Sequence, residues 1–160
     1  MEEGKPMKIA IYARVSTEDQ HVRQQLEQLR KYSVAQGWEV KREIADEESG
    51  TIPLMQRKAF KKLLDNLEGI DAVLVFNTDR LSRYWPDEPE LEQRFSSSCN
   101  LLSMKDAVDL STAAGRLMFR VKFAMNCFMP EDMREKQRVG IERAKAEGRY
   151  KYGRGRPKVR

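Results

Sequence analysis

Residues 8–15 read Lys-Ile-Ala-Ile-Tyr-Ala-Arg-Val, an apolar and β-prone run that predicts a strand. The polar, Gln-rich stretch after it carries Val22, Leu26 and Leu29 at helical spacing, so we expect a helix there. Residues 38–45 predict a second strand. A strand followed by a helix and another strand is the unit of parallel sheets, because parallel strands need a long crossover connection.

The same alternation continues through the middle of the chain. A helical stripe consists of Phe60, Leu63, Leu64 and Leu67, and we expect Gly69 to end that helix. Residues 72–76 are apolar throughout, which is typical of a strand buried on both faces. A weaker helix at 88–97 and a short strand at 101–104 complete the pattern. We therefore predict an α/β fold with a mostly parallel sheet flanked by helices, and functional residues at the C-terminal ends of the strands.

A long helix is expected from residue 112 to 148. Its apolar residues are Ala114, Leu117, Met118, Val121, Met125 and Phe128 on one stripe and Phe119, Phe123 and Cys127 on others. A helix that is apolar nearly all round needs cover on every side, so we predict self-association through Leu117, Met118, Val121, Met125 and Phe128. A central core helix within one domain is the alternative. Pro130 should break or kink the helix near residues 129–130.

Positive charge is concentrated at the end of the chain. The net charge is +5, yet residues 134–160 hold eleven Lys and Arg against three acids. This stretch suits contact with a polyanion, whereas its alternative is a flexible basic linker. The predicted DNA-binding residues are Arg149, Lys151, Arg154, Arg156, Lys158 and Arg160. We divide the chain into an α/β domain at 1–111, a helix at 112–148 and a basic arm at 149–160.

Composition narrows the class of protein. Cys99 and Cys127 form no C-x-x-C pair, and His21 is the only histidine, so a zinc site is not expected. No stretch approaches the roughly 20 apolar residues that cross a membrane. We expect a soluble, cytoplasmic protein in a reduced compartment.

Two short segments concentrate the residues capable of chemistry: 12–20, which contains Arg14 and Ser16, and 79–83, which reads Asp-Arg-Leu-Ser-Arg. Ser16 could simply cap the helix that follows it, and Arg80 and Arg83 could lie on a solvated helix face. Together, however, one serine and several arginines suit a reaction in which a hydroxyl attacks a phosphodiester, because guanidiniums stabilise the negative charge that grows on the phosphate. Asp79 is then the candidate acid or base.

These segments resemble the resolvase/invertase family of serine recombinases. The matching motifs are Tyr-Ala-Arg-Val-Ser-Thr at 12–17, Asp-x-x-Ser-Gly-Thr at 46–51 with a later arginine, Asp-Arg-Leu-Ser-Arg at 79–83, Gly-Arg-Leu-Met-Phe at 115–119 and Gly-Arg-Gly-Arg-Pro at 153–157. The resemblance covers residues 7–160. It implies a resolvase-like fold with a long C-terminal dimerisation helix.

The resemblance also implies a mechanism and its residues. Ser16 would form a covalent 5′-phosphoserine link to double-stranded DNA and release a 3′-hydroxyl, with no metal or nucleotide cofactor. The catalytic residues carried over are Ser16, Arg14, Arg80, Arg83, Asp79 and Arg57, with Gln20, Gln25 and Asp71 at auxiliary polar positions. Homodimers would pair into a tetramer that exchanges strands, and the terminal arginines would enter the minor groove.

The sequence departs from the family in two places. The family's Glu-Arg pair in the long helix is replaced by Met129 and Pro130, and the chain stops where a helix-turn-helix domain would begin. A catalytically impaired DNA-binding or regulatory protein of the same fold is therefore the alternative function. A small-molecule phosphoryl-transfer enzyme is a third possibility, although the chain has no G-x-G-x-x-G or Walker-type loop.

Overall fold

The computed structural model describes residues 5–14, 19–48, 51–97 and 99–146. For residues 19–22, 96–97 and 129–146, apart from 133 and 143, it describes the backbone alone. Contacts divide the chain into two units, Met1–Cys127 and Phe128–Arg160. The candidate site belongs to the first unit.

The centre of the first unit is a sheet of four parallel strands. They are β1 Lys8–Arg14, β2 Glu39–Asp46, β3 Ala72–Val75 and β4 Asn100–Ser103, in the order β2-β1-β3-β4. β1 and β3 are central, and Ile9–Ala13 and Ala72–Val75 are fully buried. Their apolar runs therefore reflect cover on both faces, as predicted.

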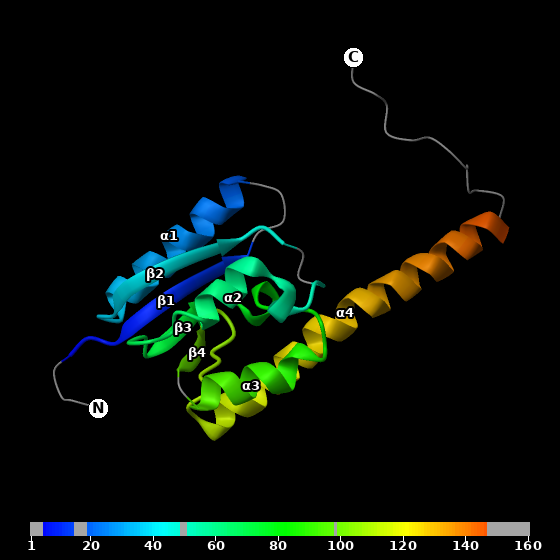
Figure 1. Cartoon of the computed structure of the whole chain (residues 1–160). Coiled ribbons are helices and arrows are strands. Elements are labelled where there is room, and N and C mark those ends of the chain that lie inside the picture. The colour runs from blue at the N-terminus through cyan, green and yellow to red at the C-terminus, as the bar shows by residue number, and fades with distance from the viewer. Residues whose placement is uncertain (1–4, 15–18, 49–50, 98, 147–160) are drawn as a thin grey trace, which may run out of the picture. The chain divides into compact units, whose positions relative to one another are not determined.

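Helices lie on both faces of the sheet (Figure 1). They are α1 Asp19–Ala35, α2 Lys58–Leu64, α3 Asp87–Ser97 and α4 Ala113–Ala146, with short 3₁₀ turns at Leu54–Gln56 and Thr78–Arg80. α2 ends at Leu64, five residues before Gly69. The earlier end follows from the turn at 65–66, and Gly69 serves a second turn with a positive φ of 71°. The α/β fold with a parallel sheet is confirmed.

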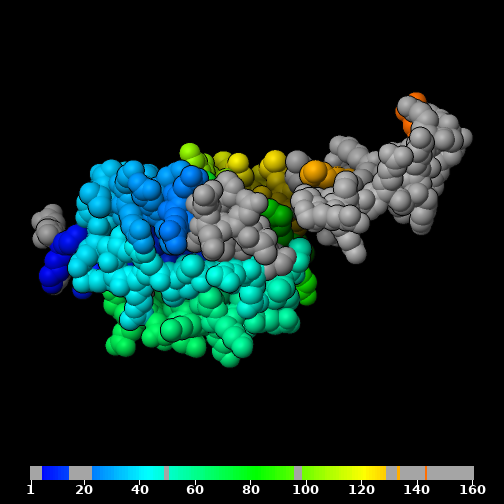
Figure 2. Space-filling model, turned by 90° about the horizontal axis from the view of Figure 1, so that it is seen from above, coloured from blue at the N-terminus to red at the C-terminus, as the bar shows by residue number. Residues whose placement is uncertain are grey.

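Strand alternation separates the core into two layers. One layer joins Ile9, Ile11 and Leu74 to Leu29 of α1. The other joins the opposite sheet face to α2, α3 and the start of α4; its members include Tyr12, Val75, Phe60, Phe95, Phe119 and Phe123. In the space-filling view, the dark blue of residues 5–8 shows at one edge of the first unit, whereas the rest of β1 is covered (Figure 2).

The first turn of α4 packs tightly against the preceding loop. Thr112 caps the helix, since its Oγ1 accepts a hydrogen bond from the backbone N–H of Gly115 at 2.9 Å. A Cβ atom on Gly115 would lie 1.8 Å from the carbonyl oxygen of Asp109, so only glycine permits this approach. Phe119 and Phe123 then enter the core. The opening of the long helix is therefore part of the α/β unit, not of a separate segment.

The structure of α4 corrects one expectation and bears on one alternative. The helix is continuous from Ala113 to Ala146, so the predicted break at 129–130 is not observed. Proline removes one hydrogen bond and crowds one turn, which a helix can absorb by bending. The alternative of a central core helix is not observed, because one apolar face of α4 is exposed. Leu117, Met118, Val121 and Met125 are 42–64% exposed in the first unit, and Phe128, in the second unit, is also exposed.

Within the described residues, no helix is both long enough and apolar enough to cross a membrane.

Candidate phosphate site at the carboxyl edge of the sheet

Arg14 is the last residue of β1 and lies at the carboxyl edge of the sheet. Its side chain is 3% exposed. Nε donates to the carbonyl oxygen of Arg80 at 3.2 Å, and Nη2 donates to that of Asp79 at 3.4 Å. Nη1 reaches the carbonyl oxygen of Glu48 at 3.4 Å. Backbone carbonyls of two other loops therefore orient this guanidinium.

Asp79 and Arg80 lie in the 3₁₀ turn Thr78–Arg80, which follows β3 at the same edge. Arg83 Nη2 lies 3.2 Å from Asp79 Oδ2, and Arg80 Nε lies 3.7 Å from Asp79 Oδ1. Asp79 Oδ1 is buried and makes no hydrogen bond within the described part of the chain. One carboxylate therefore stands between two guanidiniums, both about one third exposed.

Arg57 lies behind this pair and is completely buried. It donates to the carbonyl oxygens of Ile52 and Leu81, each at 2.7 Å, and lies 3.5 Å from the hydroxyl of Tyr12. The Tyr12 hydroxyl in turn donates to Asp46 Oδ2 at 2.6 Å. Burial, then Asp46, raise the pKa of Tyr12 well above its ordinary value. Arg57 thus connects the loop after β2 with the segment after Asp79.

The positive charges of the clustered arginines repel one another. Burial lowers the pKa of Arg14 from its ordinary value, and the charges of Arg80, Arg83 and Arg57 lower it further. Asp79 acts in the opposite direction. An arginine remains charged even so. Four guanidiniums face the carboxylates of Asp79 and, next to Tyr12, Asp46, so the locus keeps a net positive charge. A positive locus suits a phosphate because bidentate arginine contacts match its oxygens.

The model of the family described as "Resolvase, N terminal domain" matches residues 9–150. The chain belongs to the resolvase family. It is 34% identical over 151 residues to the Transposon Tn2501 resolvase of Escherichia coli, covering 92% of this chain and 75% of that protein. It is 31% identical over 139 residues to the Transposon Tn917 resolvase of Enterococcus faecalis, covering 86% and 71%.

A solved structure extends the likeness to three dimensions. The N-terminal catalytic domain of TP901-1 integrase superposes with a TM-score of 0.63 at 34% identity, covering 78% of this chain and 97% of that domain. The resolvase-like fold expected from the motifs is thereby confirmed.

The structure brings together Arg14, Asp79, Arg80, Arg83 and Arg57 in this resolvase-family chain. Gln25 is half-buried on α1, with an Oε1 that is buried and makes no hydrogen bond within the described residues. Ser16 and the arm residues 149–160 lie outside the described residues, as does the side chain of Gln20. Their roles stay predictions.

Asp71 does not join the cluster, which corrects its assignment to the site. It directly precedes β3, at the amino edge of the sheet, and its Oδ2 accepts a 2.7 Å hydrogen bond from the backbone N–H of Lys8, where β1 begins. Arg14 and Asp79 lie at the opposite edge, because the strands are parallel. Asp71 instead aligns the starts of two strands.

Sequence reasoning missed the polar residues that hold the loop after β3. Asp87 Oδ2 accepts hydrogen bonds from Ser82 Oγ at 2.6 Å and from the backbone N–H of Leu54 at 3.0 Å. Thr78 is held by Asp106 and Asn126. Asp87 belongs to the acidic segment 84–90 and is buried, so it braces the loop after β3.

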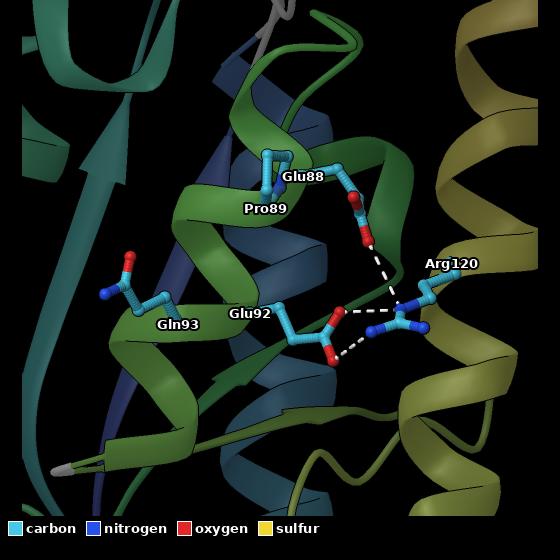
Figure 3. Close-up of a pocket in the computed structure, with 5 residues that line it drawn as sticks. All are labelled: Glu88, Pro89, Glu92, Gln93 and Arg120. Carbon is cyan, nitrogen blue, oxygen red and sulfur yellow. Dashed lines mark hydrogen bonds and ion pairs between the residues drawn. The ribbon is translucent and has the colours of Figure 1, made fainter.

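A separate pocket of about 360 Å³ lies between α3 and α4 and is lined by Glu88, Pro89, Glu92, Gln93 and Arg120. Arg120 forms two 2.8 Å hydrogen bonds with Glu92, and its Nε lies 3.7 Å from Glu88 (Figure 3). Gln93 points away from Arg120 in this view. Glu88, Glu92 and Arg120 clamp α4 to α3, and none of the carboxyl-edge arginines lines this pocket.

Proposed function

We propose that this chain is a site-specific recombinase that cleaves and rejoins double-stranded DNA, with Ser16 as the nucleophile. The supporting observation is the convergence of Arg14, Arg80 and Arg83 at the carboxyl edge of the sheet, where Ser16 follows β1 by two residues. Resolvase-family membership supports the same reaction class. The comparisons give no support to a catalytically impaired relative.

In the proposed reaction, Ser16 Oγ attacks the phosphorus of a DNA phosphodiester. A bond forms between Oγ and phosphorus, the bond from phosphorus to the 3′-oxygen breaks, and the serine proton leaves as the 3′-oxygen gains one. The arginines stabilise the negative charge on the phosphoryl oxygens. Asp79 would carry a proton, a role supported by its Oδ1, which makes no hydrogen bond within the described residues.

The phosphoserine ester keeps the energy of the broken phosphodiester. A 3′-hydroxyl can therefore attack the ester, release Ser16 and rejoin the strands without a nucleotide cofactor. Metal-free catalysis belongs to the same proposal, with guanidiniums supplying the positive charge.

The proposal extends to partners and location. The exposed residues Leu117, Met118, Val121 and Met125 support a homodimer, because a contiguous apolar surface is usually covered by a partner. Pairing of dimers into a tetramer, minor-groove contact by Arg154 and Arg156, and a cytoplasmic location complete the proposal.

The test is a denaturing-gel assay for covalent protein–DNA adducts on supercoiled DNA, using this chain fused at Arg160 to a known DNA-binding domain. Ser16→Ala should abolish the adduct. Thr17→Ala, which removes the neighbouring hydroxyl, is the matched control and should retain it. An adduct that survives Ser16→Ala would overturn the assignment of the nucleophile.

A further inference from the structure

Thr78 is the residue immediately before Asp79, and it is held by side chains from two distant parts of the chain. Its backbone N–H donates to Asp106 Oδ2 at 2.6 Å, and its Oγ1 donates to the same oxygen at 3.0 Å. Ser103 Oγ, from the end of β4, donates to that oxygen too, at 3.2 Å. Thr78 is 1% exposed, so water does not compete for these bonds.

The second side-chain partner of Thr78 comes from α4. Asn126 Nδ2 donates to Thr78 Oγ1 at 2.9 Å, and one turn earlier Lys122 Nζ lies 3.6 Å from Asp106 Oδ1. At 3.6 residues per turn, these two residues occupy the side of α4 between the buried Phe119 and the exposed Met125. They are therefore the polar boundary between the core face and the apolar exposed face.

The other end of this chain of contacts is Arg14. Its guanidinium is oriented by the carbonyl oxygens of Asp79 and Arg80, the two residues that follow Thr78. A rotation of Thr78 would turn those carbonyls and remove the acceptors of Arg14.

We propose that Asn126 and Asp106 are positioning residues that act through Thr78 on the guanidinium of Arg14. The expected effect of these residues on catalysis rests on the proposed function. Asp106 fixes the backbone of Thr78, and Asn126 makes that arrangement depend on where α4 lies. A small misplacement of a reacting group can slow catalysis strongly, so these contacts should affect the rate of cleavage more than DNA binding.

The first test needs no activity. In the 160-residue chain, the Arg14 Nε–H signal in an NMR spectrum, assigned with Arg14→Lys, reports the hydrogen bond to the Arg80 carbonyl. Thr78→Val and Asn126→Leu should each speed its exchange with solvent about threefold to tenfold, because each removes a hydrogen bond of ordinary strength. Thr78→Ser keeps the hydroxyl and should restore the original exchange rate.

Arg120→Gln is the matched control. It releases the α4 clamp to Glu92 but touches neither Thr78 nor Asp106. It should leave the Arg14 signal unchanged. An equal change in Arg120→Gln would mean that general loosening of α4 is responsible, and would overturn the proposal.

The second test uses the chain fused at Arg160 to a known DNA-binding domain. It measures the rate of adduct formation on supercoiled DNA, alongside the affinity for that DNA. Asn126→Leu should slow the adduct about threefold to tenfold with unchanged affinity, and the double variant Asn126→Leu/Thr78→Val should be no slower than Thr78→Val alone. Additive effects, or an unchanged rate, would overturn the proposal. A wild-type chain that forms no adduct would contradict the proposed function instead, and the Arg14 signal would still decide the positioning role.

Discussion

At the scale of the residue, the arginines form a site because other groups hold them in place. Arg14 and Arg57 are buried and bonded mainly to carbonyl oxygens, whereas Arg80 and Arg83 remain partly exposed. The buried pair can shape the local field and the loops. The partly exposed pair, which contacts Asp79, is accessible to a phosphate. Repulsion among like charges is then relieved when an anion arrives.

The buried hydroxyl of Tyr12 leads to a prediction about stability. Tyr12→Phe removes the donor to Asp46, whose carboxylate is 2% exposed, and should lower the free energy of unfolding by about 1–3 kcal/mol. Urea denaturation measures this. Tyr32→Phe is the control, because the Tyr32 hydroxyl has no hydrogen bond among the described residues, and it should change little. Equal stability of Tyr12→Phe and wild type would refute the importance of this bond.

Glu88 leads to a prediction about pH. Burial, followed by the charge of Glu92, raises the pKa of Glu88 above its ordinary value. The folded chain therefore holds this proton to higher pH than the unfolded chain, so stability falls as pH rises through that interval and stays reduced at neutral pH.

Glu88→Gln removes that unfavourable charge. The variant should melt at a higher temperature than wild type at neutral pH, and the difference should disappear below the ordinary glutamate pKa of about 4.3. Thermal melts at neutral and acidic pH measure both. A lower melting temperature of Glu88→Gln at neutral pH would show that attraction to Arg120 outweighs burial.

At the scale of the element, the apolar patterns predicted the strands and helices whose formation depends on nearby residues. β1 and β3 were predictable because their residues are apolar throughout, and α1 because its apolar residues recur every turn. The end of α2 was placed too late, since Leu67 packs against the core from a turn and so imitates a helical stripe. The contacts of Thr78 were not predictable, because its partners lie 28 and 48 residues away.

The start of α4 is the sharpest test of close packing. Gly115→Ala places a methyl group against the carbonyl of Asp109 and should lower the free energy of unfolding by about 1–3 kcal/mol through overpacking. Ala114→Gly, at the exposed neighbouring position, should cost at most about 1 kcal/mol through helix propensity. Urea denaturation of both variants measures these free energies of unfolding. A Gly115→Ala variant as stable as wild type would contradict the close approach of Gly115 to the Asp109 carbonyl.

At the scale of the whole molecule, the motifs predicted most of the residues that gather at the carboxyl edge, because parallel strands carry their following residues to one edge. The same rule shows why Asp71 was misplaced: it precedes its strand and so belongs to the other edge. The exposed face of α4 could be predicted as apolar, but only the fold shows that Phe119 and Phe123 serve the core while Val121 does not.

The exposed apolar face of α4 leads to a prediction about assembly. Val121→Lys places a charge in the exposed apolar face and should convert a dimer to a monomer, because a desolvated lysine opposes association. Val34→Lys is the control, since Val34 is a more exposed apolar residue on α1. Light scattering at several concentrations measures the change. A wild-type chain that is monomeric throughout, or a dimer that tolerates Val121→Lys, would contradict an interface on this face.

The central claim is that Ser16, two residues after Arg14 in the sequence, becomes covalently joined to DNA. The most direct measurement is mass spectrometry of the trapped adduct after digestion with nuclease and protease. We predict a nucleotide joined through its 5′-phosphate to the peptide that contains Ser16, with a free 3′-hydroxyl on the released strand. A nucleotide on another residue, or a link through a 3′-phosphate, would contradict the account.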